Sequence, residues 1–174
     1  MATASSEKPS RVRPPGVGLG PQEGPQEAFL ATPADIAIAG GSAGGGKTAG
    51  LLLEATRHVH VPGFSAVIFR RTYPQITAEG GLWDTSQEFF PYAGGYPVTG
   101  DLEWRFPDGS TVRFAHMQRE DDRRQWDSAQ IPLIEFDQLE SFSWKQFSYM
   151  FSRNRSVCGV QPYIRASCNP DPDC

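Results

Sequence analysis

The segment that most constrains the fold is residues 41–48, which read GSAGGGKT and fit the pattern G-x-x-x-x-G-K-[ST] in full. It follows a short apolar segment at residues 35–39 (DIAIA), which predicts a buried strand. It leads into residues 47–58 (KTAGLLLEATRH), which read as a helix. A phosphate-binding loop requires this order of strand, glycine-rich turn and helix. The sequence therefore predicts a nucleotide-binding chain.

The residue types of the loop suit the binding of phosphate groups. Glycines let backbone N–H groups converge on phosphates without Cβ clashes, and the following helix N-terminus adds partial positive charge. Lys47 can reach the β- and γ-phosphates of ATP, and the Thr48 hydroxyl can bind Mg²⁺. A merely flexible turn would not explain the Lys-Thr pair. The loop residues expected to bind ATP are Gly41, Ser42, Ala43, Gly44, Gly45, Gly46, Lys47 and Thr48.

The remaining pattern alternates buried strands with helices. Further strands are predicted at 65–69, 131–137 and 163–168, and helices at 81–90 and 143–152, the last with Ser143 as N-cap. Residues 102–106 and 111–115 flank the turn PDGS and predict a β-hairpin, either an insertion or an antiparallel edge. This order indicates an α/β P-loop NTPase with a mostly parallel central sheet flanked by helices, plus an antiparallel hairpin.

An acidic residue ends the apolar strand predicted at residues 131–137. Phosphoryl transfer in this class needs a carboxylate at the tip of a neighbouring strand to hold Mg²⁺, and Asp137 fits that place. Hydrolytic members usually have a glutamate next, where this chain has Gln138, which can orient water but cannot act as a general base. Glu140, after a helical turn, or Glu135, on the same strand face as Asp137, are the alternative carboxylates.

Residues 1–24 are rich in Pro, Gly, Ser, Glu and Gln and predict a flexible leader, so we expect one core domain over residues 25–174. The net charge of −4 gives no bulk attraction to nucleic acid, although Arg outnumbers Lys 13 to 3. No apolar run has the length of a membrane span. The three cysteines lack metal-ligand spacing and fit reduced thiols.

Several segments together resemble the large terminase subunit of tailed bacteriophages. They are the loop GGSAGGGKT, AVIFRRTYPQIT with GGLWD, LEWRFPDGSTVRFAHMQRE, IPLIEFDQLESF, SRNRS and the terminal CNPDPD. The resemblance runs from about residue 26 to residue 173. It implies an ATPase that drives double-stranded DNA into a procapsid. Its implied partners are viral DNA, the portal protein, the small terminase subunit and further copies in a ring, with no membrane. The implied location is the host cytoplasm and, transiently, the procapsid portal.

The resemblance also implies roles for single residues. Gln26 would contact adenine, and residues 167–169, ending in Asn169, would form the coupling motif that senses the γ-phosphate. In such rings an arginine often completes the neighbouring subunit's site, and Arg124 or Arg123 would be that residue, with Arg153 and Arg155 as alternatives.

Two departures from the family pattern stand out. Gln138 replaces the usual glutamate, which concerns hydrolysis more than binding. A full-length subunit would continue into a metal-dependent nuclease domain, and we expect this sequence to hold only a truncated ATPase core. The alternative functions are another P-loop DNA-translocating ATPase, such as a helicase-like or recombination ATPase, and a nucleotide-binding fragment without turnover.

Overall fold

The computed structural model describes residues 20–42 and 44–169, in which seven strands form one sheet ordered β1-β7-β6-β2-β5-β4-β3. The first five strands in this order, β1, β7, β6, β2 and β5, run parallel to one another. β4 is antiparallel to β5, and β3 is antiparallel to β4. The elements are α1 Pro25–Ala31, β1 Ile36–Gly40, α2 Lys47–Ala55, β2 Ser65–Arg70, α3 Tyr73–Thr77, α4 Leu82–Ser86, η1 Phe90–Ala93, β3 Tyr96–Val98, η2 Thr99–Asp101, β4 Glu103–Arg105, β5 Thr111–His116, η3 Glu120–Trp126, β6 Leu133–Phe136, η4 Leu139–Ser141, α5 Trp144–Phe151 and β7 Tyr163–Cys168.

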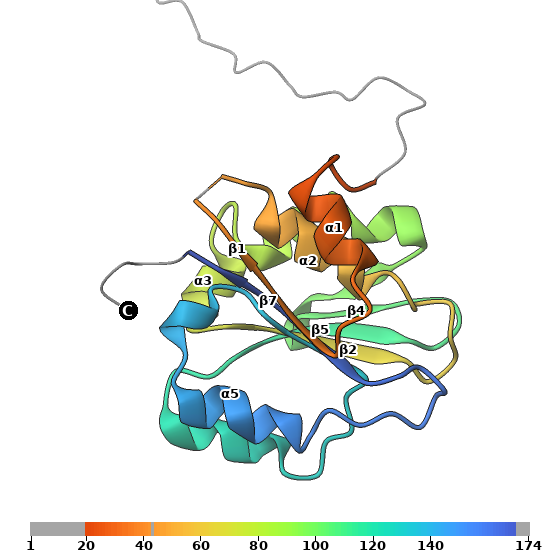
Figure 1. The fold of residues 1–174 in the computed structure, drawn as a ribbon. Helices are drawn as coiled ribbons and strands as arrows, with labels where there is room; N and C mark the ends of the chain where they lie inside the picture. The colour runs from red at the N-terminus through yellow and green to blue at the C-terminus, as the bar shows by residue number, and fades with distance from the viewer. Residues whose placement is uncertain (1–19, 43, 170–174) are drawn as a thin grey trace, which may run out of the picture.

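Helices cover both faces of the sheet (Figure 1), with α1 and α2 on one side and α5 on the other. On the α2 side the core includes Leu52, Ile68 and Leu133, and on the α5 side it includes Phe69, Phe136 and Met150. Because side chains on both faces of β2 and β6 are covered by the helical layers, these strands are apolar along almost their whole length. The predicted mostly parallel sheet with flanking helices is therefore present.

The predicted hairpin forms, and it is the edge alternative that holds. β5 pairs in parallel with β2 and antiparallel with β4, so it joins the central sheet to an antiparallel edge made of β4 and β3. Ser143 is also the N-cap of α5 as predicted, since its Oγ accepts a hydrogen bond from the Gln146 N–H at 3.2 Å.

The prediction that the strand before the loop is buried was wrong. Ile36 and Ile38 of β1 are 43% and 49% exposed. In the part of the chain that the structure describes, β1 pairs only with β7, so it is an edge strand with alternate residues in solvent.

Some boundaries also differ from the predictions. α2 ends at Ala55, three residues before the predicted end, and continues as turns. The helix predicted over residues 81–90 is the shorter α4, followed by turns and then η1. α1, α3 and β3 were not predicted. Pro74 lies in the first turn of α3 and Pro97 in β3, and proline weakens the helix and strand patterns read from sequence.

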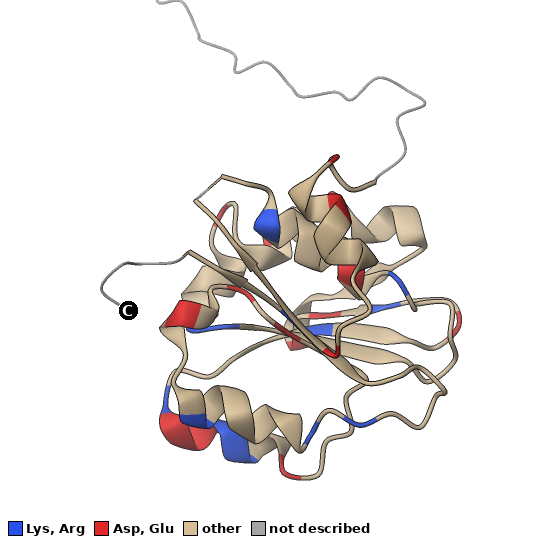
Figure 2. Ribbon diagram, viewed as in Figure 1, with Lys and Arg blue, Asp and Glu red and all other residues tan. Residues whose placement is uncertain are grey.

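Charges of both signs are spread over the molecule, and acidic and basic residues lie together in η3 (Figure 2). No helix among the described residues is both long and apolar enough to cross a membrane. Cys158 and Cys168 are free thiols. Residues 1–19, which hold most of the predicted leader, lie outside the described residues, as do residues 170–174.

Candidate nucleotide site

The glycine-rich loop connects β1 to α2 at the carboxyl end of the parallel strands. Gly44 and Gly46 have φ values of 84° and 70°, which residues with a Cβ adopt only with strain. Lys47 begins α2, and its Nζ donates hydrogen bonds to the Gly41 and Ser42 carbonyls at 2.8 and 2.6 Å. The predicted order of strand, loop and helix is therefore present, although Ala43 lies outside the described residues.

Gln26 of α1 lies against the end of the loop. Its Nε2 donates to the Gly46 carbonyl at 2.8 Å, and its Oε1 accepts from the Gln22 N–H at 2.6 Å. A cavity of about 210 Å³ lies beside it, lined by Phe29 and by loop residues including Gly45. The residue that the resemblance links to adenine thus adjoins the loop, and its amide also fixes the backbone at the start of α2.

Asp137 follows β6 at the same edge of the sheet as the loop, and it is 1% exposed. The Thr48 hydroxyl lies 3.3 and 3.2 Å from its two carboxylate oxygens, although 89 residues separate the two in sequence. Ser167, in β7, donates from its Oγ to Asp137 Oδ1 at 2.5 Å. Three elements that are distant in sequence therefore converge on one carboxylate.

Arg70, the last residue of β2, is a site residue that the sequence analysis missed. Its Nε donates to Asp137 Oδ2 at 2.8 Å, and its Nη2 forms an ion pair with the same oxygen at 2.5 Å. Its side chain is only 15% exposed. The next residue, Arg71, points to the other layer and donates to Met117 O and Gln146 Oε1. The signal available in the sequence was an arginine at the carboxyl end of an apolar strand.

Gln138 is held by both its backbone and its side chain. Its φ of 64° is one of two positive values among non-glycine residues in the described chain. Its N–H donates to Ser167 Oγ at 3.0 Å, and its Oε1 accepts from Arg70 Nη1 at 2.9 Å. A left-handed conformation in a non-glycine residue costs free energy, and such residues cluster at functional sites.

A cavity of about 340 Å³ collects most of the residues predicted for the site. They share an edge of the sheet because the carboxyl ends of parallel strands meet there. The lining comprises Gly44, Gly45, Gly46, Lys47, Thr48, Arg70, Asp137, Gln138, Ser167 and Asn169. Asn169 follows β7, and its Oδ1 is buried without a hydrogen-bond partner among the described residues.

The two alternative carboxylates do not line this cavity. Glu140 lies in η4 and is exposed. Glu135 is fully buried, and neither of its carboxylate oxygens has a hydrogen-bond partner in the described chain. Burial and the nearby charge of Glu54 raise the pKa of Glu135 well above its ordinary value, although the charge of Arg165 opposes that shift.

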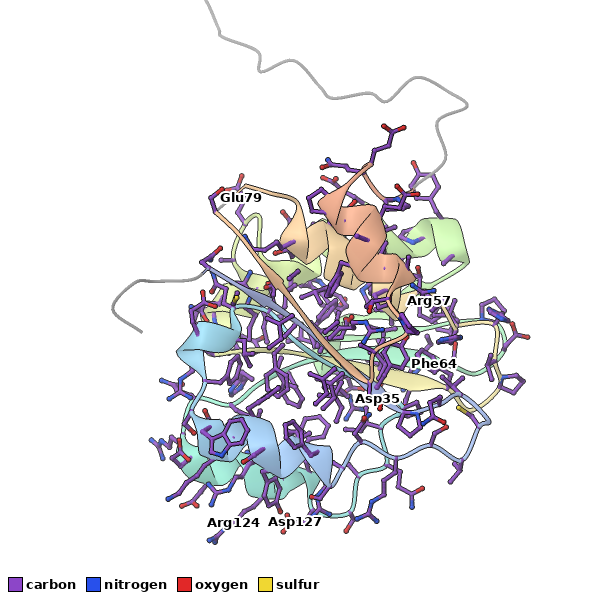
Figure 3. The ribbon with its side chains drawn as sticks, viewed as in Figure 1. Asp35, Arg57, Phe64, Glu79, Arg124 and Asp127 are labelled. Atoms are coloured by element: carbon purple, nitrogen blue, oxygen red, sulfur yellow. The ribbon has the colours of Figure 1, made fainter. Side chains whose placement is uncertain are left out.

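Arg124 does not line the cavity. It is on η3, which packs against α5 on the other side of the sheet (Figure 3), and its side chain is 68% exposed, with Nε 3.7 Å from Asp121. Arg123 pairs with Glu120 and Asp121 on the same segment, and Arg155 donates to the Ser152 carbonyl. Arg153 donates to the Asp127 carbonyl. No one of these arginines reaches the site of its own chain in the described structure.

The oxygen atoms of Thr48 and Asp137 form the part of the cavity that fits a cation. Mg²⁺ prefers oxygen ligands and is usually held by one or two protein groups together with phosphates. The described residues contain no group of three or more His, Cys, Asp or Glu side chains that could hold a metal ion by themselves. Thr48 and Asp137 could therefore contribute oxygen ligands to a Mg²⁺ ion.

Comparison with known proteins gives a family. A family model described as "Terminase large subunit, T4likevirus-type, N-terminal" matches residues 38–174. Among curated proteins, no sequence gives a significant match.

Solved structures share the fold. The large terminase from a thermophilic bacteriophage aligns with a TM-score of 0.66 and 16% identity, over 83% of this chain and 38% of that chain. Structures of the same terminase with ADP and with ATP-gamma-S each give a TM-score of 0.62, at 15% and 17% identity, over 83% of this chain and 38% and 37% of that chain.

Two further structures extend the comparison. The Thermus phage P74-26 large terminase ATPase domain gives a TM-score of 0.63 and 14% identity, over 86% of this chain and 65% of that chain. The bacteriophage Phi-29 viral genome packaging motor assembly gives 0.58 and 14%, over 85% of this chain and 47% of that chain. The predicted fold class is confirmed, and the chain spans 38% of the length of the first of these terminases.

Proposed function

The chain belongs to the terminase large subunits of the T4likevirus type, within their N-terminal region, and from this we propose that it is the ATP-hydrolysing part of a motor that packages viral double-stranded DNA into a procapsid. The observation that carries the proposal is the contact between Thr48 of the loop and Asp137 of β6. A glycine-rich loop alone could bind many phosphates. A hydroxyl and a carboxylate that meet beside it form the ligand pair that a nucleotide-bound Mg²⁺ needs.

In this proposal, backbone N–H groups of the loop and the ammonium of Lys47 bind the phosphates of ATP. The loop glycines and the N-terminus of α2 face the phosphates, and Lys47 exchanges its hydrogen bonds to the loop carbonyls for bonds to phosphate oxygens. Gln26 adjoins the adenine, and Asn169 contacts the γ-phosphate end. The structures of the thermophilic bacteriophage's large terminase with ADP and with ATP-gamma-S support ATP as the ligand.

Mg²⁺, when bound, would neutralise charge on the β- and γ-phosphates. Thr48 and Asp137 would hold it, while Arg70 and Ser167 keep the Asp137 carboxylate in one orientation. Catalysis is then positioning and charge stabilisation without a covalent intermediate. Gln138, which lines the cavity, is the side chain proposed to position the attacking water, whereas Glu140 is exposed and does not line the cavity. Since an amide cannot accept a proton, we expect slow turnover if Gln138 has this role.

In the whole motor we propose that copies of the subunit form a ring at the portal in the host cytoplasm, with the small subunit and DNA as partners. Arg124 is exposed and does not line the cavity of its own chain, so its side chain is free to serve a neighbouring subunit. The similarity to the Phi-29 viral genome packaging motor assembly supports a role in packaging. The family match argues against a helicase-like or recombination ATPase.

Nucleotide binding without turnover is the second candidate function. Gln138, in place of the usual glutamate, favours it. The two functions are discriminated by mixing ATP with an equimolar amount of the protein and measuring the release of phosphate. Release that depends on Mg²⁺ supports the motor ATPase. Tight ATP binding with no release of phosphate supports the second function.

The proposal is tested by measuring ATP affinity and hydrolysis with Mg²⁺ for the parent chain and for Lys47→Ala. We expect ATP affinity to fall at least tenfold, because a charged hydrogen bond to phosphate is lost. Lys145→Ala is the matched control, since Lys145 is exposed on α5. Unchanged ATP affinity in Lys47→Ala would contradict the assignment of the loop.

A further inference from the structure

The orientation of the Gln138 side-chain amide is fixed by its neighbour. Arg70 Nη1 lies 2.9 Å from Oε1 of Gln138, and a guanidinium can only donate hydrogen bonds. The amide oxygen must therefore face Arg70. The other end of the amide, Nε2, carries two N–H donors and no acceptor. In the part of the chain that the structure describes, no hydrogen bond from this nitrogen is found, and Gln138 lines the cavity of the loop.

Arg70 is itself held in place. Its Nε and Nη2 contact Asp137 Oδ2, so one planar guanidinium binds the carboxylate and the neighbouring amide together. Asp137 is in turn bonded to Ser167, whose Oγ also accepts the Gln138 N–H. The backbone of Gln138 is therefore connected to the buried Asp137 carboxylate through Ser167, and its side chain through Arg70. For the amide oxygen to turn towards the cavity, the bond to Arg70 would have to break.

A side chain with this orientation suits a phosphate better than an attacking water. A general base or a water-orienting group must offer an acceptor. An amide that offers only N–H groups complements phosphate oxygens instead, and it adds no negative charge beside them.

We propose that Gln138, oriented by Arg70, donates a hydrogen bond to the terminal phosphate of a nucleoside triphosphate and so makes the site prefer triphosphates to diphosphates. This inference rests on the proposed function, because it takes the cavity as the nucleotide site. It differs from the water-positioning role, since Gln138 then contributes to affinity for the triphosphate. Arg70 is a positioning residue in this arrangement.

The test is a titration of the full chain with ATP-gamma-S and, separately, with ADP in the presence of Mg²⁺. Gln138→Leu keeps the bulk of the side chain and removes the donor. We expect its affinity for ATP-gamma-S to fall about tenfold and its affinity for ADP to change less than twofold, as fits the loss of one hydrogen bond to a charged group. Gln87→Leu, at an exposed position after α4, is the matched control and should change neither affinity.

Two further variants test the orientation. Gln138→Glu is nearly isosteric but replaces the donor with a negative charge, so its loss for ATP-gamma-S should exceed that of Gln138→Leu. Arg70→Lys keeps a positive charge beside Asp137 but removes the planar fork, so it should lose part of the triphosphate preference while Gln138 is intact. Retained ADP affinity shows in each case that the variant is folded.

The outcomes separate the inference from the proposed function. If Gln138→Leu binds ATP-gamma-S as the parent does, or loses both nucleotides equally, the donor role is wrong. If the parent binds neither nucleotide, the proposed function itself fails. A Gln138→Glu variant that binds ATP-gamma-S more tightly than the parent also overturns the inference.

Discussion

Ser167 Oγ lies 2.5 Å from Asp137 Oδ1, and this bond joins the carboxyl end of β7 to that of β6. The same hydroxyl accepts the N–H of Gln138. One small side chain therefore satisfies a buried carboxylate and a strained backbone at once. The bond also links the segment that the family resemblance assigns to coupling with the residue proposed to hold Mg²⁺, so a change at one can reach the other through a single contact.

Replacement of Ser167 by alanine should destabilise the fold. Asp137 would lose a donor while buried, and the Gln138 N–H would lose its acceptor, so we expect a loss of about 1–3 kcal/mol in the free energy of unfolding. Urea denaturation of the parent and the variant measures it. Ser152→Ala, at an exposed position, should stay within about 0.5 kcal/mol. Equal stabilities of parent and Ser167→Ala would mean that this bond contributes little.

Replacement of Thr48 should act on the dependence of nucleotide binding on Mg²⁺. Thr48→Ala removes the hydroxyl beside Asp137, whereas Thr48→Ser keeps it. We expect the Mg²⁺-dependent gain in ATP affinity to fall about tenfold or more in the alanine variant and to be largely retained in the serine variant. Titrations with ATP in Mg²⁺ and in excess chelator measure the gain. Similar losses in both variants would point to packing around the methyl group instead of metal binding.

Replacement of an exposed isoleucine should reduce self-association without loss of stability. Ile38 is 49% exposed on β1, whose outer edge is unpaired in the described structure, and an apolar open edge favours pairing between chains. In sedimentation, Ile38→Lys should stay monomeric up to a higher protein concentration than the parent. The substitution should change the free energy of unfolding by less than about 1 kcal/mol. A loss of several kcal/mol would show that Ile38 is buried in solution.

The sequence was sufficient to predict those parts of the site that depend on which elements follow one another along the chain. The loop is recognisable because strand, glycines and helix follow one another, and Asp137 because it ends an apolar run. Their meeting also follows, since the carboxyl ends of parallel strands share one edge of a sheet.

The role of Arg70 could not be read in the same way. Its contact with Asp137 depends on β2 lying next to β6, and strand order is a property of the whole sheet. The left-handed backbone of Gln138 and its bond to Ser167 depend in addition on β7. The exposure of β1 escaped prediction for a related reason, because DIAIA is apolar enough for a central strand and its edge position is set by its neighbours.

Replacement of Glu103 should make stability depend less on pH. Burial on β4 raises the pKa of this carboxyl, but hydrogen bonds from Arg105 and Arg113 outweigh burial, so its pKa lies below the ordinary value. An acid with a lowered pKa stabilises the fold above its unfolded-state pKa of about 4.3, and this stabilisation is lost as the pH falls through the folded value.

We therefore expect Glu103→Gln to be less stable than the parent at pH 7, by about 1 kcal/mol because both arginines are about half exposed and solvent screens the pairs. The difference should shrink below about pH 4, where the parent carboxyl takes up its proton. Urea denaturation between pH 3 and pH 8 measures both changes. Glu79→Gln, at the exposed position labelled in Figure 3, should show no such convergence. A difference between Glu103→Gln and the parent that is the same at every pH would mean that shape, and not charge, accounts for the effect.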